Sequence, residues 1–219
     1  MKKNVGIVIA ATVALLLGAH GVTSASRPLQ AQLQLAQFNA IESLNSGHVV
    51  LRPGSTQRVT MVKGSLDYTR VAVTDRGVLV IQKCDRKCPR GYELELEILV
   101  PNISRISLSN GGRIQSLGAF PRQGELSLAV SNGGMVDVRS IVADRITATV
   151  EQGGRILTVP QSTLLARVSH GGAITYWGSG QVTSSIEDGG IVSKGSAREL
   201  VLPLSDIGKA VQAPHRRKH

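Results

Sequence analysis

The stretch Ser109-Asn110-Gly111-Gly112-Arg113-Ile114 recurs along the second half of the sequence and decides the fold. The same pattern returns at 131–136, 151–156, 169–174 and 187–192, so that successive Gly-Gly pairs lie 22, 20, 18 and 18 residues apart. Repeats of about 20 residues indicate stacked structural units, none of which buries its apolar face alone. We therefore expect a stack of five similar coils over 109–204.

Aliphatic and polar residues alternate on both sides of each glycine pair. A period of two residues indicates β-strands with one buried face rather than helices. In stacked coils equal positions lie above one another, so the aliphatic side chains would form internal columns. The pattern predicts an all-β fold, a β-solenoid with single-stranded β-helix-like coils. The expected columns contain Ile106, Leu128, Ala148, Ala166 and Ser184; Leu108, Val130, Val150, Val168 and Ile186; and Ile114, Val136, Ile156, Ile174 and Val192.

The glycine pairs are interpreted as corners between strands. The residue before each pair is Asn110, Asn132, Gln152, His170 or Asp188. Asn and Asp tolerate the left-handed backbone region, and glycine adopts it at no steric cost. The alternative is a phosphate-binding loop, which needs a strand, one such loop and then a helix. Here the motif occurs five times before a strand pattern, which favours corners.

Residues 38–108 read as short, less regular strands. Turn signals at Pro53-Gly54 and at Asp75-Arg76-Gly77 separate apolar runs, and Leu94, Leu96 and Ile98 alternate with glutamates before Pro101. These features predict an irregular β-meander that caps the N-terminal end of the stack, because an open coil would expose unpaired strand edges.

The two ends of the chain differ from this domain. Residues 1–25 have two lysines, an apolar run and small residues before Ser26, which predicts a cleaved signal peptide. Residues 26–37 are expected to be a linker or a short helix, 38–204 one domain, and 205–219 a basic tail. No lipoprotein cysteine and no membrane-spanning anchor is expected. The protein is thus predicted to be exported, with periplasm and secretion both open.

Cys84 and Cys88 are the only cysteines in the sequence. In an exported protein two cysteines so close together favour a disulfide. Zinc would need two further ligands, which do not stand nearby, and redox cysteines usually open a helix. We expect a structural disulfide in a loop between two strands.

Several motifs beyond the repeat support a family resemblance. Phe38-x-x-Ile41, Gly77-Val78-Leu79-Val80-Ile81 and Ile98-Leu99-Val100-Pro101-Asn102-Ile103 precede the recurrent Ser-x-Gly-Gly-x-Ile turns. Over roughly 38–204 the chain resembles the bacterial head GIN domain family of auto-transporter adhesins, although Glu151 and Glu187 replace the usual serine. The resemblance implies a β-solenoid-like fold, a surface or envelope location, and no catalytic residues.

Catalytic interpretations find little support. Glycosidic cleavage needs two carboxyl groups about 5–9.5 Å apart, for which Asp137 with Glu151, or Glu187 with Asp188, are the nearest candidates. Ser169-His170 suggests a nucleophile and a base, but adjacent strand residues point to opposite faces. The sequence predicts no catalytic, metal-binding or cofactor-binding residues.

Binding residues are few. An outward Trp177 could contact a sugar ring or a protein partner, or be partly buried, and Arg113 and Arg155 share an outward position two residues after the glycine. The formal charge of +10 favours anionic partners such as acidic glycans or lipopolysaccharide, but the basic residues are scattered. No specific nucleic-acid partner is expected; a protein partner or a homo-oligomer stays open.

The resulting hypothesis is a non-enzymatic, exported envelope protein that acts as an adhesion or interaction module. Two alternatives remain: a β-helical carbohydrate-active enzyme, and a periplasmic structural or stress-related protein. Clustered carboxylates in a groove would favour the enzyme, and a flat exposed face would favour binding.

Overall fold

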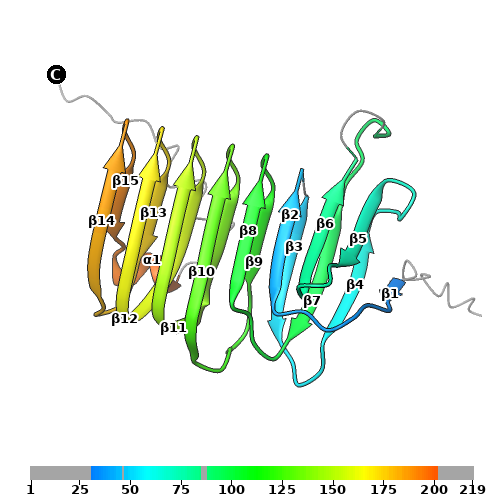
Figure 1. Ribbon diagram of the computed structural model, residues 1–219, viewed down its shortest axis with the longest axis horizontal. Coiled ribbons are helices and arrows are strands. Elements are labelled where there is room, and N and C mark those ends of the chain that lie inside the picture. Colours follow the sequence, from blue (N-terminus) through cyan, green and yellow to red (C-terminus); the bar gives the residue numbers. More distant parts are fainter. Residues whose placement is uncertain (1–30, 46, 85–87, 202–219) are drawn as a thin grey trace, which may run out of the picture.

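The computed structural model describes residues 31–45, 47–84 and 88–201 (Figure 1). The predicted signal peptide and basic tail lie outside these residues. Strands dominate the described part, which confirms the all-β prediction. They form one curled, mostly parallel sheet, in which the strands lie across the long axis of the molecule and follow one another along it. The strands are β1 (Ala31–Leu33), β2 (Ala40–Leu44), β3 (His48–Pro53), β4 (Arg58–Lys63), β5 (Thr69–Val73), β6 (Val78–Lys83), β7 (Glu95–Val100), β8 (Arg105–Ser109), β9 (Arg113–Ser116), β10 (Gln123–Ser131), β11 (Met135–Glu151), β12 (Arg155–Ser169), β13 (Ala173–Tyr176), β14 (Gln181–Glu187) and β15 (Ile191–Lys194); the one helix is α1 (Ala197–Val201).

The repeats form two rows of parallel strands. One row runs β8, β10, β11, β12 and β14, and the other runs β9, β11, β12, β13 and β15, with β11 and β12 long enough to contribute to both. The register brings Val136, Ile156 and Ile174 into one column, as the glycine spacing predicts. All three side chains are fully buried in a single apolar core.

The corner interpretation of the Gly-Gly motif is confirmed. Each of the five residues before a pair has a φ between 53° and 59°, and both glycines of each pair also have positive φ. The second glycine has a further role: a Cβ at Gly154 would lie 2.5 Å from Val130 Cγ1 in the preceding coil, whereas a Cβ at Gly153 would meet nothing within 4 Å. Close stacking of the corners therefore depends on the second position.

The N-terminal half does more than cap the stack. β2 and β3 form a coil that pairs with β8 and β9 on one side and with β6 and β7 on the other, so a segment early in the sequence lies inside the row. Its corner residue, Asn45, also has positive φ (50°), and its amide donates to the Ser109 carbonyl. The sequence Asn45-Ser46-Gly47 lacks a second glycine. A search for Gly-Gly therefore misses this sixth corner.

Antiparallel strands finish the N-terminal end. β5 and β6 form the hairpin predicted around Asp75-Arg76-Gly77, and β4 pairs antiparallel with β7. Residues 31–33, within the range expected to be a linker, form β1 against β4. Antiparallel pairing changes the strand direction at this end, so the parallel coils do not terminate in a bare parallel edge there.

The predicted disulfide joins Cys84 and Cys88 beside this end of the sheet. Nearby, the Tyr92 hydroxyl accepts from the Ser65 amide (2.8 Å) and lies 2.7 Å from the Thr69 hydroxyl. The Tyr92 ring packs edge-on against Tyr68 with 5.5 Å between centroids. These contacts fix the loop between β4 and β5.

The opposite end is built differently. β14 and β15 each pair on one side only within the described residues. The chain then turns into α1, where Ser196 and Glu199 form a capping box: the Ser196 amide donates to the Glu199 carboxylate (2.8 Å), and the Glu199 amide donates to the Ser196 hydroxyl (3.4 Å).

Candidate functional site

The most regular exposed surface is the outer side of the row β8, β10, β11, β12 and β14, which we call the hydroxyl face. Strand alternation turns these residues away from the buried columns, and the register aligns them in two columns across the row. Six of the ten carry hydroxyl groups, and all are exposed or half-buried: Arg105, Ser127, Thr147, Leu165 and Thr183; Ser107, Ala129, Thr149, Arg167 and Ser185.

The hydroxyl face forms a two-dimensional array. Neighbouring strands repeat every ~4.8 Å, and residues two apart on a strand are separated by about 7 Å. A shallow depression of about 290 Å³ crosses the array on strands β11, β12 and β14, and Leu165 and Arg167 line it. Leu165 is 44% exposed, although its strand β12 has a paired strand on each side. Hydroxyls, one apolar contact and one cation are thus presented together.

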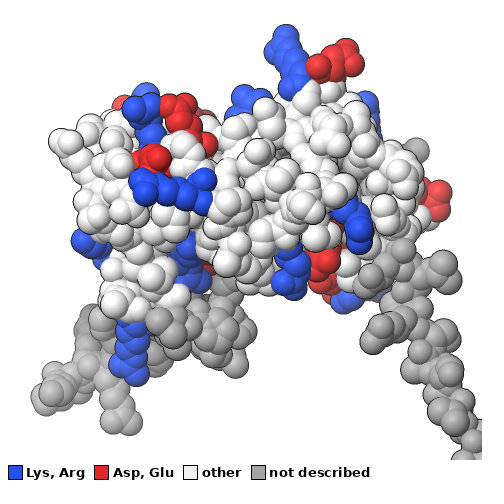
Figure 2. Space-filling model, turned by 90° about the horizontal axis from the view of Figure 1, so that it is seen from below, with Lys and Arg blue, Asp and Glu red and all other residues white. Residues whose placement is uncertain are grey.

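The charges around this face are mostly balanced. Arg167 pairs with Glu187 at 3.0 Å, and Arg145 pairs with Glu125 on the adjacent strand. Elsewhere, too, charged groups are separate and of mixed sign: Figure 2 shows small clusters on a largely uncharged surface, several with both signs together. Such exposed pairs contribute little to stability. The high net charge is not concentrated in one basic patch on this view.

Arg113 and Arg155 do share a column, as predicted, on the other row of strands. The register places Met135 between them and continues through Ala173 to Ile191. Both arginines are only half-exposed. His48 begins the same column opposite Arg113. The column is therefore mixed rather than a continuous basic strip.

His48 has a pKa that departs clearly from its ordinary value. Burial lowers the pKa of His48, and the nearby Arg113 lowers it further, while Glu95 and a hydrogen bond with Gln115 act in the opposite direction. Its Nε2 atom is buried without a hydrogen-bond partner in the structure. The imidazole is consequently held towards its neutral form.

Trp177 is buried, with only 5% of its surface exposed, although it does not belong to the main core. The chain after β15 covers it: its Nε1 donates to the Ser196 carbonyl (2.8 Å), and a Cβ at Gly195 would lie 2.1 Å from the indole ring. From the sequence, both a partner contact and partial burial were open for Trp177, and the structure shows burial. Strand parity does not reveal that a later segment crosses the outer surface.

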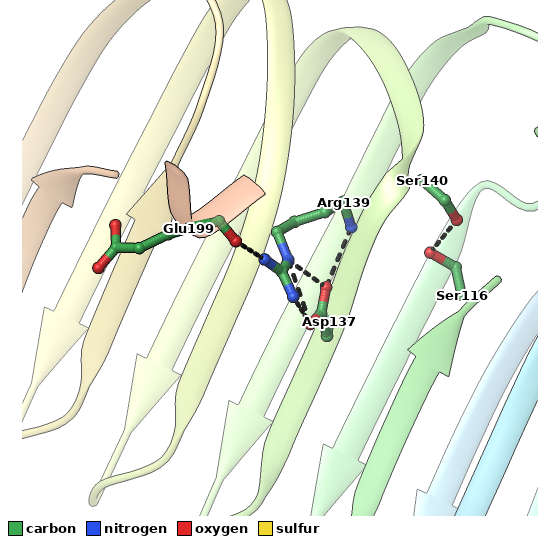
Figure 3. Close-up of polar contacts among 5 residues, drawn as sticks. All are labelled: Ser116, Asp137, Arg139, Ser140 and Glu199. Carbon is green, nitrogen blue, oxygen red and sulfur yellow. Dashed lines mark hydrogen bonds and ion pairs between the residues drawn. The ribbon is translucent and has the colours of Figure 1, made fainter. Parts of the chain in front are cut away.

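A buried ion pair next to Trp177 was not found by sequence reasoning (Figure 3). Arg139 Nη2 lies 2.8 Å from Asp137 Oδ2, and the side chains are 9% and 3% exposed. Arg139 also donates to the Glu199 carbonyl (2.6 Å), and its guanidinium lies 5.2 Å from the centroid of the Trp177 ring. The spacing Asp137-x-Arg139 on a strand, which places both side chains on one face, is the signal that could have found it.

This cluster attaches α1 to the outside of the sheet. The Arg139 guanidinium is satisfied by a carboxylate, a carbonyl and an aromatic face, so the buried charge is compensated. The role of Asp137 is therefore structural. Its carboxylate binds Arg139 and does not pair with Glu151, the candidate partner considered for glycosidic cleavage, whose side chain is exposed.

The other catalytic candidates are corner residues. His170 has a left-handed φ of 55°, and its Nε2 lies 3.3 Å from Asp188 in the next corner. Ser169 is 9% exposed. Among residues 31–45, 47–84 and 88–201, no three His, Cys, Asp or Glu side chains are grouped so as to hold a metal ion, and no helix there is long and apolar enough to span a membrane.

Comparisons with known proteins give distant structural similarity. No protein-family model and no curated protein matches the chain, so the resemblance to the head GIN family stays a prediction. Solved structures with a similar shape include a "putative adhesin" from Bacteroides fragilis (16% identity, TM-score 0.48), covering 76% of this chain and 95% of that one. A "putative cell adhesion protein" from Clostridium sporogenes (16%, TM-score 0.43) covers 76% and 100%. A "putative lipid binding protein" from Parabacteroides distasonis (11%, TM-score 0.38) covers 78% and 98%.

Proposed function

We propose that this protein is an exported β-solenoid of the bacterial envelope, related to the head GIN domain family, and that it acts as a non-catalytic interaction module. The hydroxyl face carries this proposal. It repeats from strand to strand, and all ten of its side chains are exposed or half-buried in the described part of the chain. Such a surface suits an extended partner with its own repeat.

The chemistry of the face favours a polysaccharide. Ser and Thr hydroxyls both donate and accept hydrogen bonds, as sugar hydroxyls do, and Leu165 offers an apolar contact for a sugar ring. Arg105 on the first strand of the array, β8, and Arg167 on the fourth, β12, contribute cationic groups, the second of them paired with Glu187, and the formal charge of the chain is +10. An anionic envelope glycan, such as the saccharide part of lipopolysaccharide, combines these features.

A binding screen tests this proposal. The chain without residues 1–25 is presented to lipopolysaccharide and to acidic and neutral polysaccharides, together with the variants Leu165→Asp and Arg167→Ala. We expect acidic glycans to bind best and each variant to lose roughly tenfold in affinity, about 1.4 kcal/mol. Arg52→Ala is the matched control, because Arg52 is also exposed and ion-paired but lies on β3 in the other row. Equal binding by all variants would exclude the hydroxyl face.

The proposed export has its own test. Expression of the full sequence in a Gram-negative host, followed by fractionation and N-terminal sequencing, should find a mature chain beginning near Ser26 outside the cytoplasm. An uncleaved cytoplasmic product would contradict the proposed signal peptide and leave the binding experiment unaffected.

A further inference from the structure

The C-terminal end of the sheet exposes large aliphatic residues, one of them in a column that the rest of the stack buries. Val168 on β12 is fully buried, but Ile186, the next member of its column on β14, is 48% exposed. On β15, Ile191 is 60% exposed. The outer backbone groups of both strands have no sheet partner among the described residues. Long unprotected edges of this kind invite pairing with another strand.

The residue types of β14 read nearly the same from either end of the strand. It reads Gln181-Val182-Thr183-Ser184-Ser185-Ile186-Glu187, so polar, aliphatic and hydroxyl residues occur in the same order from either end. In an antiparallel pair of two such strands centred on Ser184, each residue faces a chemically matching one. Opposite residues in an antiparallel pair point to the same side of the sheet, so aliphatic residues would meet on the core side.

We propose that a second copy of this chain pairs with this edge, β14 against β14, antiparallel about a two-fold axis through Ser184. Val182 then contacts the partner's Ile186, Thr183 lies opposite the partner's Ser185, and Gln181 lies opposite the partner's Glu187. The contact is isologous, so it closes as a dimer and does not propagate into fibres. It removes the exposed edge and buries both copies of Ile186.

The path of the chain after β15 favours a second copy of the chain, rather than the chain's own C-terminal residues, as the partner of the β14 edge. Lys194 ends the edge strand β15, Ser196 then contacts Trp177 just after β13, and Glu199 contacts Arg139 on β11. The segment thus runs away from the edge, towards the interior strands of the row. Coverage of β14 by residues 202–219 is the alternative that the experiment must exclude.

Cysteine cross-linking of the full mature chain tests the register. Both native cysteines form one disulfide, so new thiols are unambiguous. Ser184→Cys should give a covalent dimer under mild oxidation, because residues directly opposite in an antiparallel pair have Cα atoms about 4.5–5.5 Å apart, within disulfide range. Gln181→Cys is the control: two copies of residue 181 would lie about 20 Å apart and should not cross-link. Cross-linking of both variants alike, or of neither, would overturn the proposal.

The oligomeric state provides the second measurement. By sedimentation, the mature chain should have twice its monomer mass, and Ile186→Lys should raise the dimer dissociation constant roughly a hundredfold, because two charges would be buried in the contact. Circular dichroism checks that the variant is folded. A monomeric mature chain that dimerises only after truncation at Val201 would show that its own C-terminal residues cover the edge, and would overturn the proposal.

Discussion

The two ends of the sheet differ in how their edge strands are protected. At the N-terminal end, β1, β4 and β5 add antiparallel strands, and a disulfide and the Tyr92 contacts fix the adjoining loops. At the C-terminal end, β14 and β15 continue the parallel repeat, no further strand of the described part of the chain pairs with them, and Ile186 and Ile191 are exposed. A regular repeat specifies how one coil stacks on the next, but it does not specify how the stack ends.

Between these ends, the coil of β2 and β3 and the repeat coils have similar geometry but different sequence signals. Both place a left-handed residue at the corner, Asn45 in one and Gln152 in another. Only the repeats use two glycines there. A corner therefore requires the backbone conformation and space for the next coil, and Gly-Gly is one way of providing them. The following predictions test how far this equivalence extends.

The largest effect is expected in the shared core. Ile156→Asp places a carboxylate at a fully buried position between Val136 and Ile174. Without compensation this should cost several kcal/mol, comparable with the whole stability of a domain. The cooperative thermal transition should disappear in calorimetry. Ile191→Asp, at an exposed position, is the control and should melt close to the parent; a parent-like transition of Ile156→Asp would refute the assigned column.

The next effect concerns the cluster that holds α1. Arg139→Met leaves Asp137 buried without its partner, which should lower the unfolding free energy by about 3–5 kcal/mol. Because Trp177 packs against Arg139 and is the only tryptophan, its fluorescence should shift to longer wavelength in the folded variant. Arg122→Met, which breaks the exposed pair with Asp144, should cost less than about 1 kcal/mol and leave the spectrum unchanged.

The two glycines of one corner should differ measurably. Gly154→Ala forces a Cβ against Val130 at a φ of 104°, and we expect a loss of about 2–3 kcal/mol in denaturant unfolding. Gly153→Ala has open space around the new Cβ at a φ of 83° and should lose only about 1 kcal/mol. Equal losses would mean that backbone conformation alone, and not coil stacking, requires the pair.

The disulfide should matter less than the core. It closes a loop of five residues, for which the chain-entropy relation gives about 2 kcal/mol at most. Cys84→Ser/Cys88→Ser should therefore fold, with a modest decrease in the denaturant midpoint. Mass spectrometry of the unreduced parent should show the two cysteines linked to each other, and free thiols in freshly prepared protein would contradict this assignment.

The smallest effect is a pH dependence from His48. Because its folded pKa is lowered, the unfolded chain binds the proton more readily, and stability is lost as the pH falls from above the unfolded value near 6.5 through the folded pKa. His48→Gln should flatten this part of the profile of stability against pH. If parent and variant keep the same slope between about pH 7 and 5, His48 is not the responsible group.

The sequence alone determined the strands of the repeats, the five Gly-Gly corners and the core columns between them, because these depend on neighbours a fixed distance apart in the chain. Period-two alternation selects Ile156 as buried, and the residue before Gly-Gly must tolerate positive φ wherever it occurs. The same local reasoning found the hairpin around Gly77 and the disulfide.

Only the tertiary structure decided the order of the coils and whether outward-pointing side chains are buried or exposed. β2 lies between β6 and β8, and β3 lies between β7 and β9. Long-range pairing, and not adjacency in the sequence, determines this order. Trp177 and Asp137 point outward by parity, yet both are buried. Trp177 contacts Ser196 just before α1, and Asp137 is paired with Arg139, which donates to the Glu199 carbonyl in α1. Periodicity shows which face of a strand a side chain occupies, whereas burial depends on what a distant segment later covers.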